Sequence, residues 1–415
     1  MAAKDSESLS VVAEAAVSEK YGPAHTFGSI SYALRASSED MARFAAEAKL
    51  DSQGISSRSG QNGAGRFFRN PKMMPVYSLR GVDTNIDREG VLVLQKPGGE
   101  DAWVFSDALE EVLDPKAVAL RRDYYPELEQ FILENVVTAD GRHPKYAVCA
   151  GSQIFTEDKS RGYTGSYARS AHSDVFEIRP DVDDLQSGFW DPVGWDAATI
   201  STGNFKHNSA TTPYPQYRHF VQAAERPLIH PYAGMVFGGG HSSASRWIMR
   251  GAQPPHGTSS IDGPENLLIS KGISVEEARG MDLMMVNAWR PFSWSVADNP
   301  LAVLDCTSIH AEEDYYRIPD GVPMTAGEPP QRITHNPGHR WLYVPDMRPD
   351  EVLVFKQGDS RLGTEQDTGE LSRFGFHTAF RLPGDPGGEH GHRNRRSIAS
   401  RLLLLFERVP PCAKL

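Results

Sequence analysis

The feature that most restricts the fold is a series of short apolar segments in the second half of the chain, each bounded by turn residues. They include MMVNAWRPFSW, LAVLDCTSI, HRWLYVPDM and DEVLVFKQGDS, followed by a last apolar run over residues 402–406. Segments of this length, rich in Val, Leu, Phe and Trp, are typical of β-strands. Because such strands alternate with turns, the sequence predicts a mainly β protein, a β-barrel or jelly roll with flanking helices packed outside it.

The first half of the chain shows helical patterns before the strands begin. Apolar residues recur at helical spacing over residues 11–19, 37–48 and 109–137. We therefore expect an N-terminal helical extension and linker over residues 1–75. A single barrel domain is expected over residues 76–415, with an insertion around residues 173–228 that is rich in Asp, Gly, Pro and Trp.

The composition excludes several classes of partner. A formal charge of −11 and a pI near 5.7 leave no basic surface for a nucleic acid or an anionic membrane. The chain has no apolar window of the length that a transmembrane helix needs, and its first residues lack the order of a secretory signal. The three cysteines lie far apart and indicate neither a disulfide framework nor a thiolate zinc site. We therefore expect a cytoplasmic protein.

Two polar motifs flank the last turn of the predicted barrel. His377 lies on one strand, and Arg395 and Ser397 begin the next. An imidazole can bind a metal ion, while a guanidinium and a hydroxyl together can hold a carboxylate. The same residues also suit a buried core histidine and a surface arginine cluster, so the pattern alone leaves both interpretations open.

Several motifs together resemble the fungal hydroxylase/desaturase family, which includes gibberellin desaturases and a cephamycin methoxylase component. They are YSLRGVDTNIDREGVLVL, YYPELEQFIL, VNAWRPF, HRWLYVPDMRPDEVLVFKQGDS, HTAF and RRSIASR, which occur in order between residues 76 and 408. The resemblance implies a double-stranded β-helix of the type that uses Fe(II) and 2-oxoglutarate and acts on a small natural product. It implies further that His377 is the distal iron ligand and that Arg395 and Ser397 bind 2-oxoglutarate, with Arg401 on the same face of the strand.

The second half of the iron site is less evident, because the family carries a His-x-Asp pair about forty residues before its Asn-x-Trp-Arg-Pro motif. The corresponding segment here is Gly238-Gly239-Gly240-His241-Ser242-Ser243. In one register His241 is the ligand and Ser243 replaces the aspartate; in the other His241 replaces the aspartate. Neither register restores two imidazoles and a carboxylate, the set that non-haem iron(II) prefers. We take His241 as the second metal-ligand candidate.

Two other histidines compete with His241. A His-x-Asp sequence occurs at His172-Ser173-Asp174, but it precedes His377 by 205 residues, a long separation within one barrel. It could equally be a surface turn, unless a large insertion lies inside the barrel. His230, which precedes a proline, could be a ligand or could satisfy a buried carbonyl.

Further residues follow from strand alternation. Asn287 shares a strand face with Trp289, and we expect it to point toward the substrate, while Arg290 takes the other face in a structural salt link. Tyr343 is a second candidate catalytic residue. Lys356 and Asp359 are expected to form a buried ion pair near a strand end.

The leading hypothesis is an Fe(II)- and 2-oxoglutarate-dependent oxygenase of specialised metabolism that hydroxylates, desaturates or oxidatively cyclises a small natural product. Two alternatives remain open at this point: a barrel without its iron site that acts as a redox-neutral isomerase or cyclase, and a non-catalytic partner of an active homologue. We expect a small-molecule substrate, neither nucleic acid nor membrane as a partner, and a chain that can form a homodimer.

Overall fold

The computed structural model describes somewhat under half of the chain. The described residues are 19–33, 69–99, 102–103, 123–155, 171–173, 175–177, 235–237, 271–274, 277–278, 280–292, 294–317, 331–361, 369–372, 375–383 and 395–408. The helical pattern at residues 37–48, most of the insertion at 173–228, His230 and His241 lie outside these residues.

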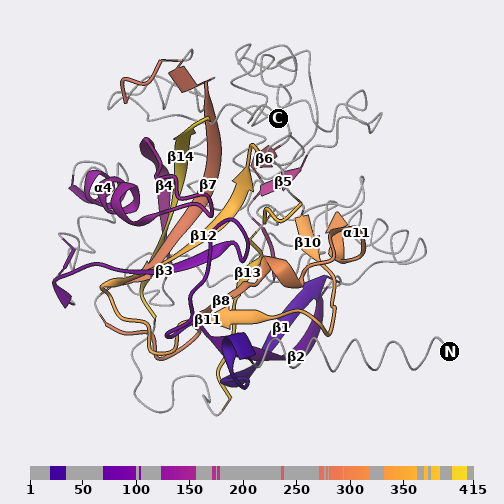
Figure 1. Ribbon diagram of the computed structural model, residues 1–415. Helices are drawn as coiled ribbons and strands as arrows, with labels where there is room; N and C mark the ends of the chain where they lie inside the picture. The colour runs from indigo at the N-terminus through magenta and orange to yellow at the C-terminus, as the bar shows by residue number, and fades with distance from the viewer. Residues whose placement is uncertain are drawn as a thin grey trace, which may run out of the picture.

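Two five-stranded sheets form the body of the described structure (Figure 1). Sheet A has the order β1 (Thr26–Ala33), β2 (Arg69–Ser78), β11 (Trp341–Tyr343), β8 (Leu301–Leu304) and β13 (His377–Ala379). Sheet B has the order β3 (Val91–Gln95), β12 (Glu351–Asp359), β7 (Met281–Pro291), β14 (Ser397–Glu407) and β4 (Tyr146–Phe155). Two small two-stranded sheets pair β5 (Val175–Glu177) with β6 (Met235–Phe237), and β9 (Tyr315–Arg317) with β10 (Gln331–Ile333). The helices are α4 (Tyr125–Asn135), α11 (Ala311–Asp314) and the 3-10 turn η9 (Cys306–Ser308).

The order in which the chain visits the two sheets defines the fold. From β11 to β14 each strand lies in the opposite sheet from the strand before it. The sheets pack face to face through a cluster that joins Leu353 and Phe355 of sheet B to Val303 and Leu342 of sheet A. This alternation between two facing sheets is a double-stranded β-helix, as the sequence predicted.

The central strand of sheet B is buried on both faces, and its side chains divide between them. Leu283, Met285 and Trp289 of β7 pack toward sheet A, whereas the even-numbered Met284 and Val286 pack outward. The strand is buried over its whole length. The period-two alternation therefore assigns each odd-numbered polar residue of β7, and of its neighbour β14, to the space between the sheets.

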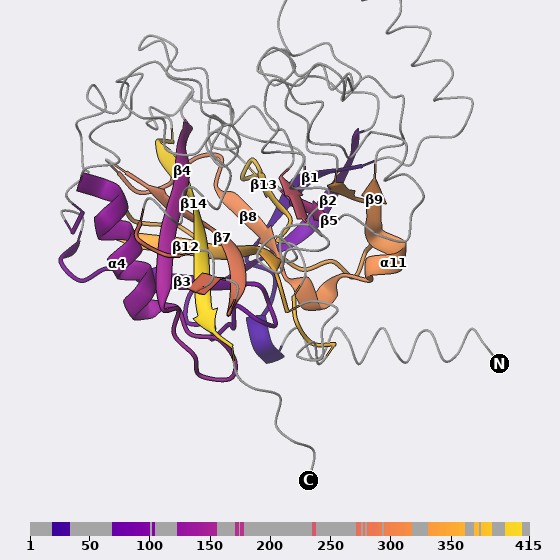
Figure 2. The ribbon, with the colours of Figure 1, turned by 90° about the horizontal axis from the view of Figure 1, so that it is seen from above.

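Helix α4 covers the outer face of sheet B (Figure 2). Its sequence places a proline in the first turn and presents Leu128, Phe131 and Ile132 at helical spacing, and these three are its buried residues. They pack against the outward side chains of β7 and β14, so the second part of the helical pattern at 109–137 is confirmed. Among the helices of the described segments, none is long and apolar enough to cross a membrane.

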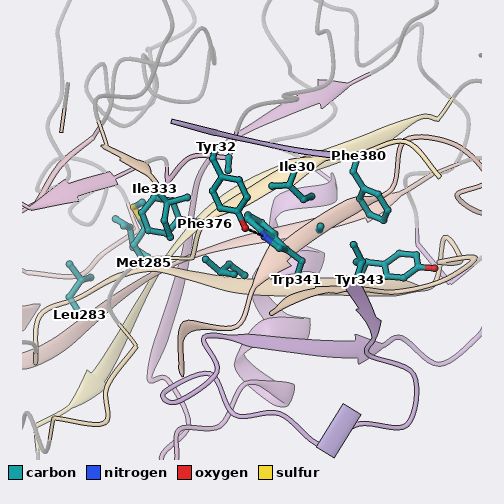
Figure 3. Packing of buried hydrophobic residues seen from close by; sticks show 14 of the residues in the cluster. Ile30, Tyr32, Leu283, Met285, Ile333, Trp341, Tyr343, Phe376 and Phe380 are labelled. Carbon is teal, nitrogen blue, oxygen red and sulfur yellow. Dashed lines mark hydrogen bonds between the residues drawn. The ribbon is translucent and has the colours of Figure 1, made fainter. Parts of the chain in front are cut away.

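The N-terminal segment contributes strands to sheet A. β1 pairs antiparallel with β2, and β2 pairs in parallel with β11. The expected boundary between residues 75 and 76 therefore falls inside β2. Ile30 and Tyr32 of β1 pack with Trp341, Phe376 and other residues of the cluster in Figure 3, so this part of the N-terminal segment shares the core of the barrel.

A buried charge network lies at the end of β12. Lys356 donates to Asp359 at 2.9 Å and to Asp87 at 3.3 Å, and Arg361 donates to the same two carboxylates. All four residues are buried. The expected Lys356–Asp359 ion pair is confirmed, and it belongs to a larger set of two cations and two carboxylates that balance one another.

This network predicts a specific acid sensitivity. Burial by itself raises the pKa of Asp359, but Lys356 and Arg361 outweigh it and lower the pKa to about 2. An unfolded aspartate titrates near 3.9, so the shift contributes about 2–3 kcal/mol of stability above pH ~4, which is lost as the pH falls toward 2. We expect Asp359→Asn to lower the free energy of unfolding at pH 7 by about 3–5 kcal/mol, as measured by denaturant unfolding.

The gap in stability between the wild type and Asp359→Asn should shrink as the pH is lowered from 4 to 2. The matched control is Lys271→Gln, which breaks the partly exposed 2.8 Å pair with Glu129 and should cost less than about 1 kcal/mol. Equal acid sensitivity of the wild type and Asp359→Asn would contradict the role assigned to Asp359.

Candidate functional site

Two histidines that are far apart in the sequence meet in the structure. The backbones of His172 and His377 exchange hydrogen bonds of 3.2 Å and 2.9 Å, and their ring centroids lie 4.4 Å apart. Both residues are buried, with 8% and 7% of their surface exposed. Two neighbouring imidazoles on bridged backbone segments are side chains of the kind that bind metal ions.

The position of His377 on β13 directs its ring between the sheets. His377 pairs with Val303, which packs toward sheet B, and its ring lies 4.8 Å from that of Phe355 in β12. Its Nδ1 lies 3.2 Å from the carbonyl oxygen of Gly375. Because a carbonyl only accepts, this contact puts the ring proton on Nδ1 and makes Nε2 the atom that carries the lone pair.

The sequence around His172 contains a carboxylate residue, Asp174, in a His-Ser-Asp order. Asp174 itself lies outside the described residues, and among the described residues no group of three or more His, Cys, Asp or Glu side chains gathers as a metal site. In the sequence, however, Asp174 stands two positions after His172. Two imidazoles and a carboxylate from a His-x-Asp pair and a distant histidine are the donor set that suits non-haem iron(II).

The topology explains the long separation between these histidines. β4 precedes His172 and β7 follows the segment after it, and both strands pair with β14 in sheet B. The residues between Glu177 and Lys271 are therefore an insertion between strands of one barrel. His241 lies four residues after β6, whose last residue, Phe237, pairs with Val175; the role expected of His241 stays a prediction.

Arg395 and Ser397 lie at the start of β14. The backbone N–H of Arg395 donates to Asp298 at 2.8 Å, and its guanidinium donates to the carbonyl of Asn299 and lies 5.3 Å from the ring centre of Trp289. Asn299 has a φ of +43°, a left-handed conformation that asparagine adopts more readily than most residues. Arg395 is therefore held in place by a tight turn and by an aromatic ring on the inner face of sheet B.

The hydroxyl oxygen of Ser397 is available to bind a ligand. The residue is fully buried, and its hydroxyl has no hydrogen-bond partner among the residues that the structure describes. A buried polar group without a partner costs stability, and such groups are rare outside functional sites. A guanidinium and a hydroxyl two residues apart on one strand face fit a carboxylate.

Asn287 and Arg401 lie on the central strands of sheet B. They are direct neighbours across the β7–β14 pair, and Phe355 is the neighbour of Asn287 on its other side. By strand alternation all three side chains face sheet A. The row Phe355–Asn287–Arg401 therefore lines the same inter-sheet space as the ring of His377.

The side chain of Tyr343 points away from the space between the two sheets. Its neighbour Leu342 packs toward sheet B, whereas Tyr343 packs with Phe380 and Trp341 on the opposite face of sheet A (Figure 3). Its hydroxyl lies 2.6 Å from Nδ1 of His25, and burial raises its pKa to about 12, so it is neutral at pH 7. The structure brings Tyr343 to neither histidine of the pair.

Arg290 also faces away from the inter-sheet space, as expected, and it contacts two aromatic rings there. Its guanidinium lies 4.7 Å from the ring centre of Trp103 and 5.0 Å from that of Tyr124, and it donates to the Tyr124 hydroxyl at 3.2 Å. These contacts are a cation–π stack against two aromatic rings; the expected salt link of Arg290 stays a prediction.

One residue of the site escaped the sequence analysis. Gln357 is fully buried between Lys356 and Gly358 and donates to the carbonyl of Gly375 at 2.9 Å. It also accepts a hydrogen bond of 3.2 Å from the hydroxyl of Ser173. A single glutamine within a strand belongs to no sequence motif. The direction of its side chain depends on the irregular pairing of β12 with β7 at this point, which the sequence does not reveal.

The chain is similar to several known proteins. Residues 268–405 match a family described as "Oxidoreductase/YMDC permease-like domain". The chain is 35% identical over 137 residues to the hydroxylase/desaturase asaB of Aspergillus flavus, a match that covers 30% of this chain and 56% of that protein. It is 32% identical over 108 residues to the gibberellin cluster GA4 desaturase of Gibberella fujikuroi, over 26% of this chain and 31% of that one.

The chain also aligns with a solved structure. The iron and alpha-ketoglutarate-dependent endoperoxidase NvfI aligns with 92% of this chain and 100% of its own, at 16% identity and a TM-score of 0.48. The sequence matches are shorter, and this chain spans about half or less of the length of the two relatives named above. Within that span the chain is similar in sequence to the fungal hydroxylase/desaturases, as the motifs in its sequence indicated.

Proposed function

We propose that the protein is an Fe(II)- and 2-oxoglutarate-dependent oxygenase that acts on a small natural product. The observation that carries the proposal is the pairing of His172 with His377, because it joins a His-x-Asp sequence to the distal histidine between the two sheets. The sequence relatives include hydroxylase/desaturases and proteins named as alpha-ketoglutarate-dependent dioxygenases.

In this proposal His172, Asp174 and His377 hold the iron. Two neutral imidazoles and one carboxylate leave coordination positions for a cosubstrate and dioxygen. The Nδ1 contact of His377 with Gly375 supports this role, because it fixes the ring and leaves Nε2 as the donor atom. An isomerase or a non-catalytic partner was considered because no His-x-Asp pair occurs near residue 241. The pairing of His172 with His377 supports a different His-x-Asp pair, so it favours the oxygenase over these two alternatives.

Arg395 and Ser397 would hold the distal carboxylate of 2-oxoglutarate. The guanidinium supplies the positive charge, and the buried Ser397 hydroxyl donates the second hydrogen bond. Bound iron and 2-oxoglutarate supply the oxidising power for attack on an unactivated C–H bond. Asn287 and Arg401 would orient the substrate or cosubstrate, and the packed residues between the sheets exclude water.

The reaction class stays open between hydroxylation, desaturation and oxidative cyclisation, each of which begins with removal of hydrogen from carbon. We propose a cytoplasmic location, from the acidic composition and the separated cysteines. A small-molecule substrate fits a site that is buried between two sheets.

The iron assignment predicts a metal content that depends on both histidines. Protein purified anaerobically and reconstituted with Fe(II) should hold about one iron per chain, and His172→Gln and His377→Gln should each lose most of it. Iron analysis and succinate formation from 2-oxoglutarate measure the effect. The control is His143→Gln, which changes an exposed histidine. Wild-type iron content in both site variants would contradict the assignment.

The cosubstrate assignment predicts a change in the KM for 2-oxoglutarate. Ser397→Ala removes one hydrogen bond to a charged group, worth about 1.5–3 kcal/mol, so the KM should rise about 10- to 100-fold. Ser400→Ala is the matched control, since Ser400 bonds Ser152 at 2.6 Å on the opposite face of the same strand and should leave this KM unchanged. A Ser397→Ala variant with the wild-type KM would refute the carboxylate clamp.

A further inference from the structure

We infer that Gln357 is a positioning residue that clamps together the two chain segments bearing the proposed iron ligands and fixes the tautomer of His377. The inference rests on the proposed function only for the identity of the metal. The hydrogen bonds that carry it are present whatever the site binds.

The side chain of Gln357 connects three segments that are far apart in the sequence. Its Nε2 donates to the carbonyl oxygen of Gly375 at 2.9 Å, and its Oε1 accepts from the hydroxyl of Ser173 at 3.2 Å. Ser173 lies between His172 and Asp174, while Gly375 lies two residues before His377. One amide therefore bridges the His-Ser-Asp segment and the segment that carries the distal histidine.

An irregularity in sheet B directs this amide. β12 pairs with β7 in regular register up to Lys356, and the register then shifts so that Gly358 pairs with the next residue of β7. Gln357 is the extra residue of a β-bulge. Bulges redirect a side chain at one point of a strand and are frequent beside active sites, which fits a residue that must reach two other segments.

The Gly375 carbonyl is the shared acceptor that links the clamp to the metal ligand. It accepts from Nε2 of Gln357 and from Nδ1 of His377, while the N–H of Gly375 donates to the carbonyl of Lys356 at 2.7 Å. A Cβ at Gly375 would collide with that Lys356 oxygen, so the close approach requires glycine. The carbonyl is thereby held from both sides and directs the proton of His377 to Nδ1.

The chemistry calls for an amide at position 357. The carbonyl of Gly375 needs a donor, and the hydroxyl of Ser173 needs an acceptor, and a neutral side chain of this length that offers both is glutamine. Gln357→Glu would keep the acceptor and place a second oxygen against the carbonyl. Gln357→Met would keep the size and lose both hydrogen bonds.

The experiment first examines the metal-free full-length protein. ¹⁵N–¹H correlation spectra of histidine-labelled protein, with His377 assigned from a His377→Gln variant, should show the Nδ1-protonated tautomer in the wild type. Gln357→Met and Gln357→Glu should show a mixture of tautomers. The control is Gln95→Met, which removes the amide hydrogen bond of Gln95 to Asp350 at the outer strand β3 and should leave the His377 signals unchanged.

The second readout is the affinity for Co(II), used as a spectroscopic probe in place of iron. We expect Gln357→Met to weaken Co(II) binding about 10- to 100-fold and to alter the visible spectrum of the bound ion, as is usual when a group that orients a metal ligand is removed. Ser173→Ala, which loses one arm of the clamp, should have a smaller effect. Thermal melting of the metal-free variants distinguishes a repositioned ligand from an unfolded chain.

The outcomes separate the two proposals. Wild-type tautomer and wild-type Co(II) affinity in a folded Gln357→Met protein would overturn the role of Gln357. A tautomer that depends on Gln357 in a wild-type protein that binds neither Co(II) nor Fe(II) would uphold the clamp and overturn the proposed iron site.

Discussion

The backbone bridge between His172 and His377 is the contact on which the organisation of the site depends. Each residue donates its N–H to the carbonyl of the other, so the two backbone segments cannot separate without the loss of two hydrogen bonds. The bridge joins the segment after β4 to the free edge of sheet A, because β13 is the last strand in the order of that sheet. The contact that pairs the two histidines therefore also connects the segment after β4 with sheet A.

Much of this arrangement could be predicted from the sequence. The strand-length apolar runs and the alternation along β7 were sufficient to predict the jelly roll and the inward face that carries Asn287. The pairing of His172 with His377 was harder to foresee, because a separation of 205 residues seemed long for one barrel. The entropy of closing a loop grows only with the logarithm of its length, by about 0.6 kcal/mol per doubling. A long insertion is therefore a weak argument against a contact between its ends.

Other parts of the site depend on information that periodicity does not contain. The outward position of Tyr343 follows from which face of sheet A meets sheet B, and this is fixed by the partners of β11 and not by its own three residues. The role of Gln357 depends on a bulge, where the period of two fails. The stack of Arg290 on Trp103 and Tyr124 likewise joins residues that no local pattern connects.

The residues at the bulge in β12 take part both in the buried charge network that stabilises the barrel and in the hydrogen bonds that orient His377. On one side of it, Lys356 is held by Asp87 and Asp359 in the buried charge network. The carbonyl of the same Lys356 accepts the N–H of Gly375, whose own carbonyl accepts Nδ1 of His377. A change in the charge network can therefore alter the position of His377 through these two hydrogen bonds. The amide of Gln357 donates a second hydrogen bond to the same carbonyl. Two separate interactions therefore hold the carbonyl that orients the His377 ring, and a metal ligand needs one fixed orientation.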